Sequence, residues 1–547
     1  MVTKMEQKKR TDSFIRQAGI LAAAGIICRI IGILYRSPLT AIIGAEGNGY
    51  YSTAYNIYTI ILLISSYSIP SAISKVIAQR LALKEYRNAH RIFQCAILYV
   101  VVVGGLASII AFLAAPILVE KNSVLVLRIF APTIFLSGLL GVLRGYFQAH
   151  KTMLQTSFSQ IMEQILNAVI SVLAAYLLIQ LVVGKDTTTR AIYGAAGSAL
   201  GTGSGVVIAL IFMLGIYRLN KQQIMKRVKK DRSRQTLETG EIFRIIISMV
   251  TPVILSTFIY NFSTSLNQTV FYKIMMYVKN MEESGAATLY GIFGGEAVVI
   301  ANIPIAIASA MSASLIPSVS GAYATGDIPG TNRKINAAIK VTMFISIPAA
   351  VGIFVLARPV VLLLFPQKAT VDMASGLLRA LSITVIFYSL STLTNAVLQG
   401  IGKVNIPVIN AALSLGIQSL ILIPLLYFTD LGLYSLVIAT VCYSLSMCIL
   451  NQISVKKILG LKQNVVRTYI LPVVSSGVMG VVAILVYKGM YDLIKSNVIS
   501  LFLAIALAGV AYFATALGTG AMNREELASL PKGRTLVRIA EKCRLIR

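Results

Sequence analysis

The sequence predicts an all-α, polytopic membrane protein of about 14 transmembrane helices. Hydrophobic residues make up 56% of the 547-residue chain, charged residues make up 13%, and the mean hydropathy is +0.79. Apolar runs of about 20 residues, the length that crosses a bilayer as a helix, recur along the chain with short polar breaks between them. Soluble cores cannot bury so large an apolar fraction. These observations disfavour a soluble enzyme, a nucleic-acid-binding protein and a disordered chain.

The first predicted span follows a basic N-terminal stretch. It is long and contains Arg29 and Arg36, whereas the apolar core of a signal peptide is short and ends at a small-residue cleavage site. Each later apolar run is interpreted as one helix that ends at the next polar break. The predicted spans are residues 17–43, 50–79, 92–119, 124–148, 155–184, 191–217, 245–278, 286–320, 335–365, 373–402, 405–429, 431–455, 468–490 and 496–520.

The basic residues indicate how the chain is oriented. The net charge is +29, and assigning the breaks alternately to the two sides puts about 34 of the 49 Lys and Arg residues on the side of the N-terminus and about 7 on the other. Because cytoplasmic loops are rich in basic residues, we expect both termini in the cytoplasm. The basic clusters in 218–244 and 521–547 are also expected to contact anionic lipids. Breaks on the other side, such as Gly44–Gly49, are too short to hold a catalytic domain.

Two halves of the chain repeat one another. Leu127-Arg128 and Tyr176 recur as Leu378-Arg379 and Tyr427 at a spacing of 251 residues. Each half holds six spans, so both halves enter the membrane from the same side, which predicts a parallel repeat around a central cavity. The predicted organisation is an N-lobe at 1–217, a basic cytoplasmic linker at 218–244, a C-lobe at 245–458, spans 13 and 14 at 459–520 and a basic cytoplasmic tail at 521–547.

Span 1 carries two cations on one helical stripe. Gly25, Arg29, Gly32 and Arg36 follow one another at spacings of three and four residues. Two guanidinium groups are suited to a diphosphate, because each donates two parallel hydrogen bonds and stays charged in apolar surroundings. The alternative is that these arginines only extend toward lipid headgroups.

Polar side chains also gather on spans 5 and 7. Such residues are expensive inside a membrane, so they indicate either a wet cavity or hydrogen bonds between helices. Glu163 could bind a cation, titrate, or pair with an arginine. The candidates for contact with a polar head group are Gln160, Glu163, Gln164, Asn167, Asn261, Asn267 and Gln268.

A second carboxylate lies in span 8. Glu296 follows two glycines and precedes Asn302 and Pro304, which predicts an irregular helix, and both Glu296 and Glu163 are candidates for coupling to an ion. Four further polar residues at span ends are candidates for the inner mouth of the cavity, although helix capping or extension toward headgroups explains them better. They are Lys75, Gln148, Asn395 and Gln399.

Motifs of enzymes and metal proteins were not found. The sequence lacks a G-x-x-x-x-G-K-[ST] phosphate loop, so ATP is not the expected energy source. His90 and His150 are expected to be solvated loop residues, and the Asp residues stand singly in separate breaks. The five cysteines form no C-x-x-C pair. We therefore expect a transporter that is not an enzyme, holds no metal or cofactor, and is driven by the membrane potential or a monovalent ion.

The run Cys28-Arg29-Ile30-Ile31-Gly32-Ile33-Leu34-Tyr35-Arg36, together with the two repeated six-span bundles, resembles the multidrug/oligosaccharidyl-lipid/polysaccharide (MOP) exporter superfamily. Within it, the chain is similar to the polysaccharide-biosynthesis branch that includes stage V sporulation protein B and the Gram-positive MurJ-type lipid II flippases. The resemblance implies a bacterial cytoplasmic membrane protein with two lobes in a V. It also implies flipping of a lipid-linked saccharide by alternating access, with the lipid tail held by spans 13 and 14.

The match to that branch is incomplete. Arg29 and Gly32 fall on the family pattern, but Arg36 does so only after a one-residue insertion, and Ser37 replaces the usual Asp. The arginines that the resemblance implies in spans 2 and 8 have no counterpart, because Ser65-Ser66 and Glu296 stand there.

Our leading hypothesis is a flippase for lipid II or a related undecaprenyl-diphosphate-linked oligosaccharide, with Arg29 and Arg36 on the diphosphate. A cation-coupled multidrug exporter of the same superfamily is the alternative, and a scaffold without transport in a cell-wall or sporulation complex is the third. The expected partners are the lipid-linked substrate, anionic lipids and cell-wall synthesis proteins, with no nucleic acid.

Overall fold

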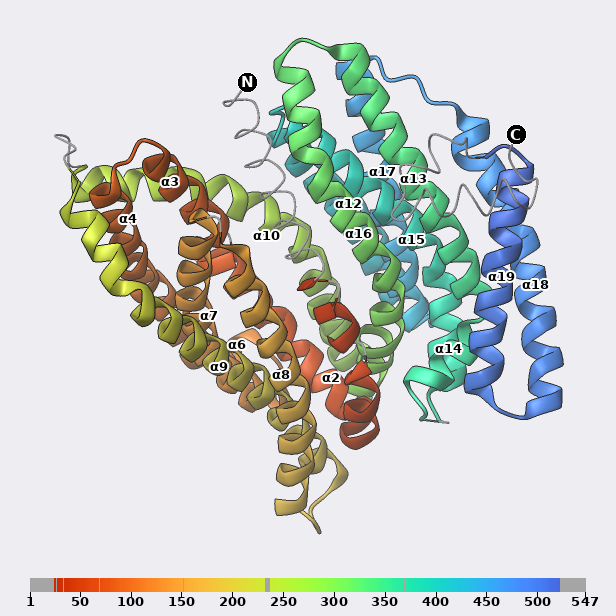
Figure 1. The fold of residues 1–547 in the computed structure, drawn as a ribbon. Helices are drawn as coiled ribbons and strands as arrows, with labels where there is room; N and C mark the ends of the chain where they lie inside the picture. The colour runs from red at the N-terminus through yellow and green to blue at the C-terminus, as the bar shows by residue number, and fades with distance from the viewer. Residues whose placement is uncertain are drawn as a thin grey trace. The chain divides into compact units, whose positions relative to one another are not determined.

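The computed structural model describes most of the chain between residues 24 and 521 (Figure 1). All of the regular structure in that described part is helical. Positions without description inside it are 26, 33, 68, 151, 232–236 and 368. The predicted tail at 521–547 lies, except for its first residue, outside the described residues.

The helices of the first part are as follows. They are α2 (Arg36–Leu62), α3 (Ile69–Ala82), α4 (Tyr86–Tyr99), α5 (Gly105–Leu113), α6 (Ala115–Leu118), α7 (Val124–Ala149), α8 (Met153–Leu181), α9 (Thr187–Lys229), α10 (Thr239–Tyr277) and α11 (Glu283–Tyr290). Short π- or 3₁₀-helical segments join some of them, at η1 (Leu63–Tyr67), η2 (Val100–Gly104) and η3 (Lys121–Ser123).

The remaining helices begin with a π-helical segment inside the predicted eighth span. They are η4 (Gly291–Ala297), α12 (Val298–Ala324), α13 (Ile328–Val355), α14 (Ala357–Leu364), α15 (Val371–Gly400), α16 (Asn405–Phe428), α17 (Leu433–Leu459), η5 (Val466–Ile470), α18 (Leu471–Ile494) and α19 (Asn497–Gly518).

Eleven helices within the described residues are long and apolar enough to cross a membrane. They coincide with the predicted spans 3 to 6 and 8 to 14, so the all-α membrane fold is confirmed, whereas the total of fourteen is not. Predicted spans 1, 2 and 7 are also helical where they are described, apart from turns at Tyr35 and Val278. The predicted break at Gly44–Gly49 is reduced to Gly44, whose φ of 70° is accessible to a residue without a Cβ atom.

The predicted linker at 218–244 is largely helical. The helix α9 has 43 residues and continues through the basic segment to Lys229, and α10 begins at Thr239. Lys, Arg and Gln favour helices, and the basic side chains of the last turn stabilise the carbonyl end of the helix. Asp186 caps the other end of α9, where two hydrogen bonds from Thr189 lower the pKa of its carboxyl.

The chain divides into two compact units. The first contains Met1–Tyr272 and Lys279–Gly291, and the second contains Lys273–Val278 and Ile292–Arg547. Most of the predicted seventh span therefore belongs to the first unit. Residues matched by the repeat have the same burial, since Leu127 and Leu378 are fully buried while Tyr176 and Tyr427 are 51% and 50% exposed. Homology between the two six-span halves stays a prediction.

In the first unit, small residues let helix backbones approach closely. A Cβ atom built on Gly197 or Gly201 of α9 would lie 2.4 Å from the nitrogen of Ala175 or 2.2 Å from Oγ of Ser171 on α8. A Cβ atom built on Gly205, four residues further on, would lie 2.6 Å from the carbonyl oxygen of Glu163. Small residues spaced four apart on one helix face let two membrane helices pack closely. This packing fixes α8 against α9 and thereby sets the position of Glu163.

The helix α11 packs on α2 by the same means. A Cβ atom on Gly49 would lie 2.0 Å from the oxygen of Ala287, and one on Gly291 would lie 2.0 Å from the oxygen of Ala45. Side chains of α2 and α10 add hydrogen bonds beside these glycines, including Asn56 to Gln268 at 2.5 Å. We refer to this contact of α2 with α10 and α11 as the glycine seam.

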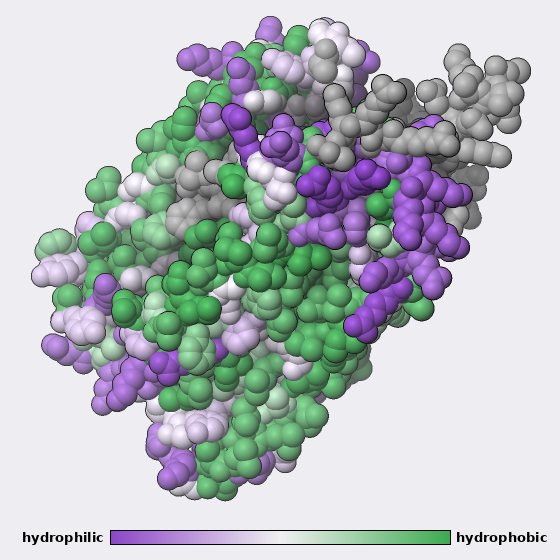
Figure 2. Space-filling model, turned by 90° about the vertical axis from the view of Figure 1, so that its left-hand side faces the viewer, coloured by the Kyte–Doolittle hydropathy of each residue, from purple (hydrophilic) through white to green (hydrophobic). Residues whose placement is uncertain are grey.

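In the second unit, α12, α13, α15 and α17 surround a buried aliphatic cluster that includes Val319, Ile339 and Val397. The last two helices, α18 and α19, pack together and against α13, and the Tyr512 hydroxyl donates to the Phe344 carbonyl at 2.7 Å. Figure 2 shows one face of the whole molecule, on which broad hydrophobic surface lies between hydrophilic patches at the upper right and the lower left. Such a surface is suited to lipid.

Candidate functional site

The arginine stripe of span 1 faces α8. A Cβ atom on Gly32 would lie 3.2 Å from Nε2 of Gln164, which places the glycine side of the stripe against that helix. Arg29 is exposed and Arg36 is half-buried. Neither arginine forms an ion pair or a hydrogen bond with any of the described residues. The part of the chain that the structure describes therefore supplies no counter-ion to the two cations of this span.

Tyrosines of α2 surround the Arg36 end of the stripe. Tyr51 and Tyr55 stack with their ring centroids 5.6 Å apart, and Arg36 lies within electrostatic range of both hydroxyl groups. Tyr58 stacks on Phe130 at 4.7 Å. Tyr51 and Tyr58 are buried in this aromatic cluster, and Tyr55 is half-buried, so Tyr55 is the member that can present its hydroxyl group to a ligand beside the cation.

The polar stripe of α8 divides into two parts. Asn167 is satisfied within the bundle, because its Oδ1 accepts from Ser171 at 2.9 Å and from Thr202 at 3.3 Å. This part forms the hydrogen bonds between helices that were the alternative to a head-group site. Gln160 and Gln164 are half-buried and make no side-chain hydrogen bond with any described residue.

Glu163 pairs with an arginine that the sequence analysis missed. Nη2 of Arg144 on α7 lies 2.6 Å from Oε2 of Glu163, and its Nε donates to Oγ of Ser159 at 2.9 Å. The rule that singled out Arg29, a charge inside a span, applies equally to Arg144, which lies four residues before the predicted end of span 4. Only the contact with α8, however, shows which carboxylate it meets.

The polar residues of span 7 lie in the glycine seam. Gln268 is buried and accepts from Asn56, which also donates to the hydroxyl of Tyr290 at 3.1 Å. Asn267 is also buried, and Asn261 is half-buried. Packing against α2 and α11 thus accounts for Gln268, while a role for Asn261 and Asn267 at a head group stays a prediction.

Glu296 lies in the π-helical segment η4, where a π-turn breaks the regular helix as the sequence predicts. Its carboxylate is fully buried in the second unit. Thr370 donates to its two oxygens at 3.3 and 3.4 Å and is its one hydrogen-bond partner among the described residues. A buried carboxylate with so weak a partner is chemically suited to hold a proton or a monovalent cation.

The four inner-mouth candidates have different surroundings. Lys75 is exposed, and Gln148 and Gln399 are half-buried. Asn395 is buried and accepts from Nδ2 of Asn451 at 2.8 Å, so it belongs to a hydrogen-bonded contact between α15 and α17. A role for these residues in substrate entry stays a prediction.

His90 and His150 are half-buried, which differs from the expected solvated loops. Both lie beside aromatic rings, since Tyr146 is 4.5 Å from the ring of His150 and Phe93 is 6.2 Å from that of His90. Burial lowers the pKa of His150, and Arg227 lowers it further. No group of three or more His, Cys, Asp or Glu residues able to hold a metal occurs within the described residues.

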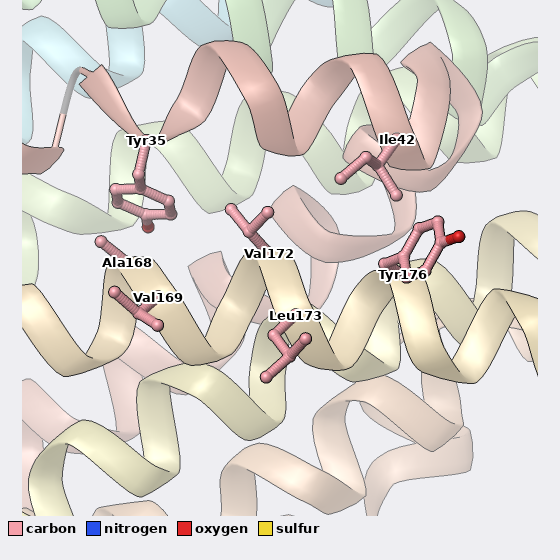
Figure 3. Close-up of a pocket in the computed structure, with 7 residues that line it drawn as sticks. All are labelled: Tyr35, Ile42, Ala168, Val169, Val172, Leu173 and Tyr176. Carbon is pink, nitrogen blue, oxygen red and sulfur yellow. The ribbon is translucent and has the colours of Figure 1, made fainter.

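An open apolar groove of about 480 Å³ lies beside span 1 (Figure 3). Two of its side chains come from the Tyr35–Ile42 part of the chain and five from α8. The lining residues are Tyr35, Ile42, Ala168, Val169, Val172, Leu173 and Tyr176. A groove lined in this way suits a hydrocarbon chain and not a charged head group.

Comparison with known proteins identifies the family. The model of the family described as lipid II flippase MurJ matches residues 57–507. The chain belongs to the MurJ family. Lipid II flippase MurJ of Bacillus subtilis (strain 168) is 24% identical over 489 residues, which cover 86% of this chain and 88% of that protein. Stage V sporulation protein B of the same organism is 22% identical over 539 residues, which cover 96% and 99%.

Solved structures share the fold of this chain. A lipid II flippase MurJ in an inward closed conformation superposes with a TM-score of 0.66 at 13% identity, covering 91% of this chain and 97% of that one. An outward-facing multidrug resistance MATE family transporter of the MOP superfamily superposes with a TM-score of 0.58 at 16% identity, covering 81% and 95%. These likenesses show the fold. The predicted similarity to MurJ-type flippases and stage V sporulation protein B is confirmed, and the chain is a multi-pass membrane protein of the MurJ family.

Proposed function

We propose that this MurJ-family chain flips lipid II or a related undecaprenyl-diphosphate-linked oligosaccharide from the inner to the outer leaflet of a bacterial cytoplasmic membrane. The observation that carries the proposal is the stripe of Arg29 and Arg36, two cations without a counter-ion among the described residues. An uncompensated charge inside a span is unfavourable until an anion binds. A diphosphate supplies that anion, and each guanidinium can bind it with two parallel hydrogen bonds.

The rest of the substrate has matching surroundings in the first unit. The hydroxyl group of the half-buried Tyr55 lies within electrostatic range of Arg36, and in our proposal it contacts the saccharide. The apolar groove between span 1 and α8 offers a hydrocarbon surface for the first isoprene units. The prediction that spans 13 and 14, now α18 and α19, hold the distal part of the tail is retained in this proposal.

Transport requires that the protein alternates between two states. We propose that the glycine seam closes one end of the pathway and opens in each cycle. In this proposal both termini are in the cytoplasm, and the membrane potential acts on the positive charges of the protein when no substrate is bound. Moving one elementary charge across a potential of 100 mV changes the free energy by about 2.3 kcal/mol. In this proposal Glu296 is the coupling candidate, because its carboxylate is buried and has no counter-ion among the described residues.

A cation-coupled exporter of amphipathic drugs is the second candidate function. It is favoured by the buried Glu296 and by the fold shared with a MATE family transporter. A cationic drug, however, would be repelled by Arg29 and Arg36, and for this reason we rank it below the flippase.

Genetic complementation tests the proposed function. The chain is expressed in a bacterium depleted of its own lipid II flippase, and membrane insertion is verified with an epitope tag. We expect growth to be restored, because the chain replaces the missing flipping step. Failure of growth despite full membrane expression contradicts lipid II as the substrate. Resistance to cationic drugs without growth would then favour the exporter.

A further inference from the structure

Arg144 and Glu163 form an ion pair that the proposed function does not use. Arg144 belongs to α7 and Glu163 to α8, and both lie in predicted spans. The pair is only partly buried, with 14% of the arginine side chain and 28% of the glutamate side chain exposed. A charge pair that is accessible within a membrane span normally faces a polar cavity and takes part in function.

Two contacts hold the guanidinium of Arg144 in place. Nη2 donates to Glu163 at 2.6 Å and Nε donates to Ser159 at 2.9 Å, so both contacts lie on one side of the planar group. Arginine has five N–H donors, and the other three have no acceptor among the residues that the structure describes. A fixed guanidinium with unused donors on Nη1 is ready to bind an anion.

The pair lies in the same part of the first unit as the arginine stripe. Cys28, the neighbour of Arg29, is within electrostatic range of both Arg144 and Glu163. Tyr55 is within electrostatic range of both Arg36 and Glu163. Gln164, which follows Glu163, faces Gly32 of the stripe. The ion pair and the stripe of span 1 are therefore in the same region of the first unit, next to one another on α8.

We propose that Arg144 is a third arginine of the diphosphate-binding site and that Glu163 and Ser159 are the residues that position it. The proposal rests on the proposed function, since it assigns a further ligand to the same substrate. Arg29 and Arg36 supply the net positive charge. Arg144, whose charge Glu163 offsets, supplies oriented donors that reach a second phosphoryl group and so favour a diphosphate over a monophosphate.

Binding of two defined lipids tests this role. The purified full-length protein is titrated with undecaprenyl diphosphate and with undecaprenyl phosphate in detergent, and binding is measured by native mass spectrometry against phosphatidylglycerol. The double variant R144Q/E163Q removes both charges together, so no unpaired charge is left to prevent folding. We expect it to bind the diphosphate about tenfold or more weakly and the monophosphate almost unchanged.

Single substitutions of Glu163 separate positioning from a direct role. E163Q keeps an oxygen that accepts from Nη2 and removes the negative charge, so we expect the diphosphate to bind as tightly as to the wild type or more tightly. E163A removes the acceptor, and we expect weaker binding of the diphosphate. The control is R80Q/E85Q, which removes a similarly buried ion pair of 3.1 Å elsewhere in the first unit and should leave binding unchanged.

The outcomes distinguish this inference from the proposed function. If the wild type binds neither lipid above phosphatidylglycerol, both are wrong. If the wild type prefers the diphosphate and R144Q/E163Q keeps the same preference, only the role of Arg144 is wrong. A loss of thermal stability in R144Q/E163Q with unchanged preference would likewise identify the pair as purely structural.

Discussion

Replacing Arg29 and Arg36 together by glutamine is expected to abolish growth in the complementation test while the protein still reaches the membrane. Each arginine that binds a phosphoryl group through charge-assisted hydrogen bonds contributes about 1.5–3 kcal/mol to the free energy of binding. The double variant should therefore bind the diphosphate more weakly by a factor of roughly 100 or more. R36K alone keeps the charge but loses the planar pair of donors, and we expect it to retain part of the activity.

The control for this prediction is another arginine in a span of the first unit. Arg128 lies over the ring of Phe112 at 5.4 Å and is exposed, and we propose no contact between it and the substrate. R128Q is expected to support normal growth. Normal growth with R29Q/R36Q at wild-type expression levels would remove the diphosphate role from the stripe.

Side chains introduced into the glycine seam are expected to produce the second large effect. Even alanine at Gly49 or Gly291 places a Cβ atom 2.0 Å from a backbone oxygen, so α2 and α11 must move apart. Overpacking of this kind typically destabilises a protein by about 1–3 kcal/mol. We expect G49A and G291A to lower the thermal stability of the purified protein, and G49L or G291L to abolish growth because the seam no longer closes.

The matched control for the seam is Gly215 of α9. A Cβ atom built on this glycine would have no other atom within 4 Å. G215L makes the same change in side-chain size and in helix propensity on an open surface, and we expect normal growth and normal thermal stability. Full growth with G49L would show that transport does not need close packing of α2 and α11.

The membrane-spanning helices were predictable from the sequence for a physical reason. A bilayer requires about 20 apolar residues per span, and this requirement is local, so the runs at 124–148 and 405–429 coincide with α7 and α16. The extension of α9 to Lys229 was not predicted, because a basic segment after an apolar run was read as a loop although its residues favour a helix.

Partners of polar residues were less predictable. The sequence singled out Glu163 and suggested an arginine as one possible partner, but Arg144 lies 19 residues away on another helix, and only the packing of α7 and α8 brings the two together. The same applies to Gln268, for which the sequence leaves a cavity and a contact between helices equally open, and which bonds to Asn56 of α2. Spacing along one helix defines a face, whereas the neighbour of that face depends on tertiary packing.

The most direct test of the central claim is a translocation measurement with purified components. The full-length chain is reconstituted into vesicles that contain fluorescent lipid II, and a membrane-impermeant quencher reports which leaflet holds the label. We expect the wild type to move lipid II between leaflets and R29Q/R36Q to behave like vesicles without protein. If wild-type vesicles also match the protein-free ones under an imposed membrane potential, the chain is not a lipid II flippase.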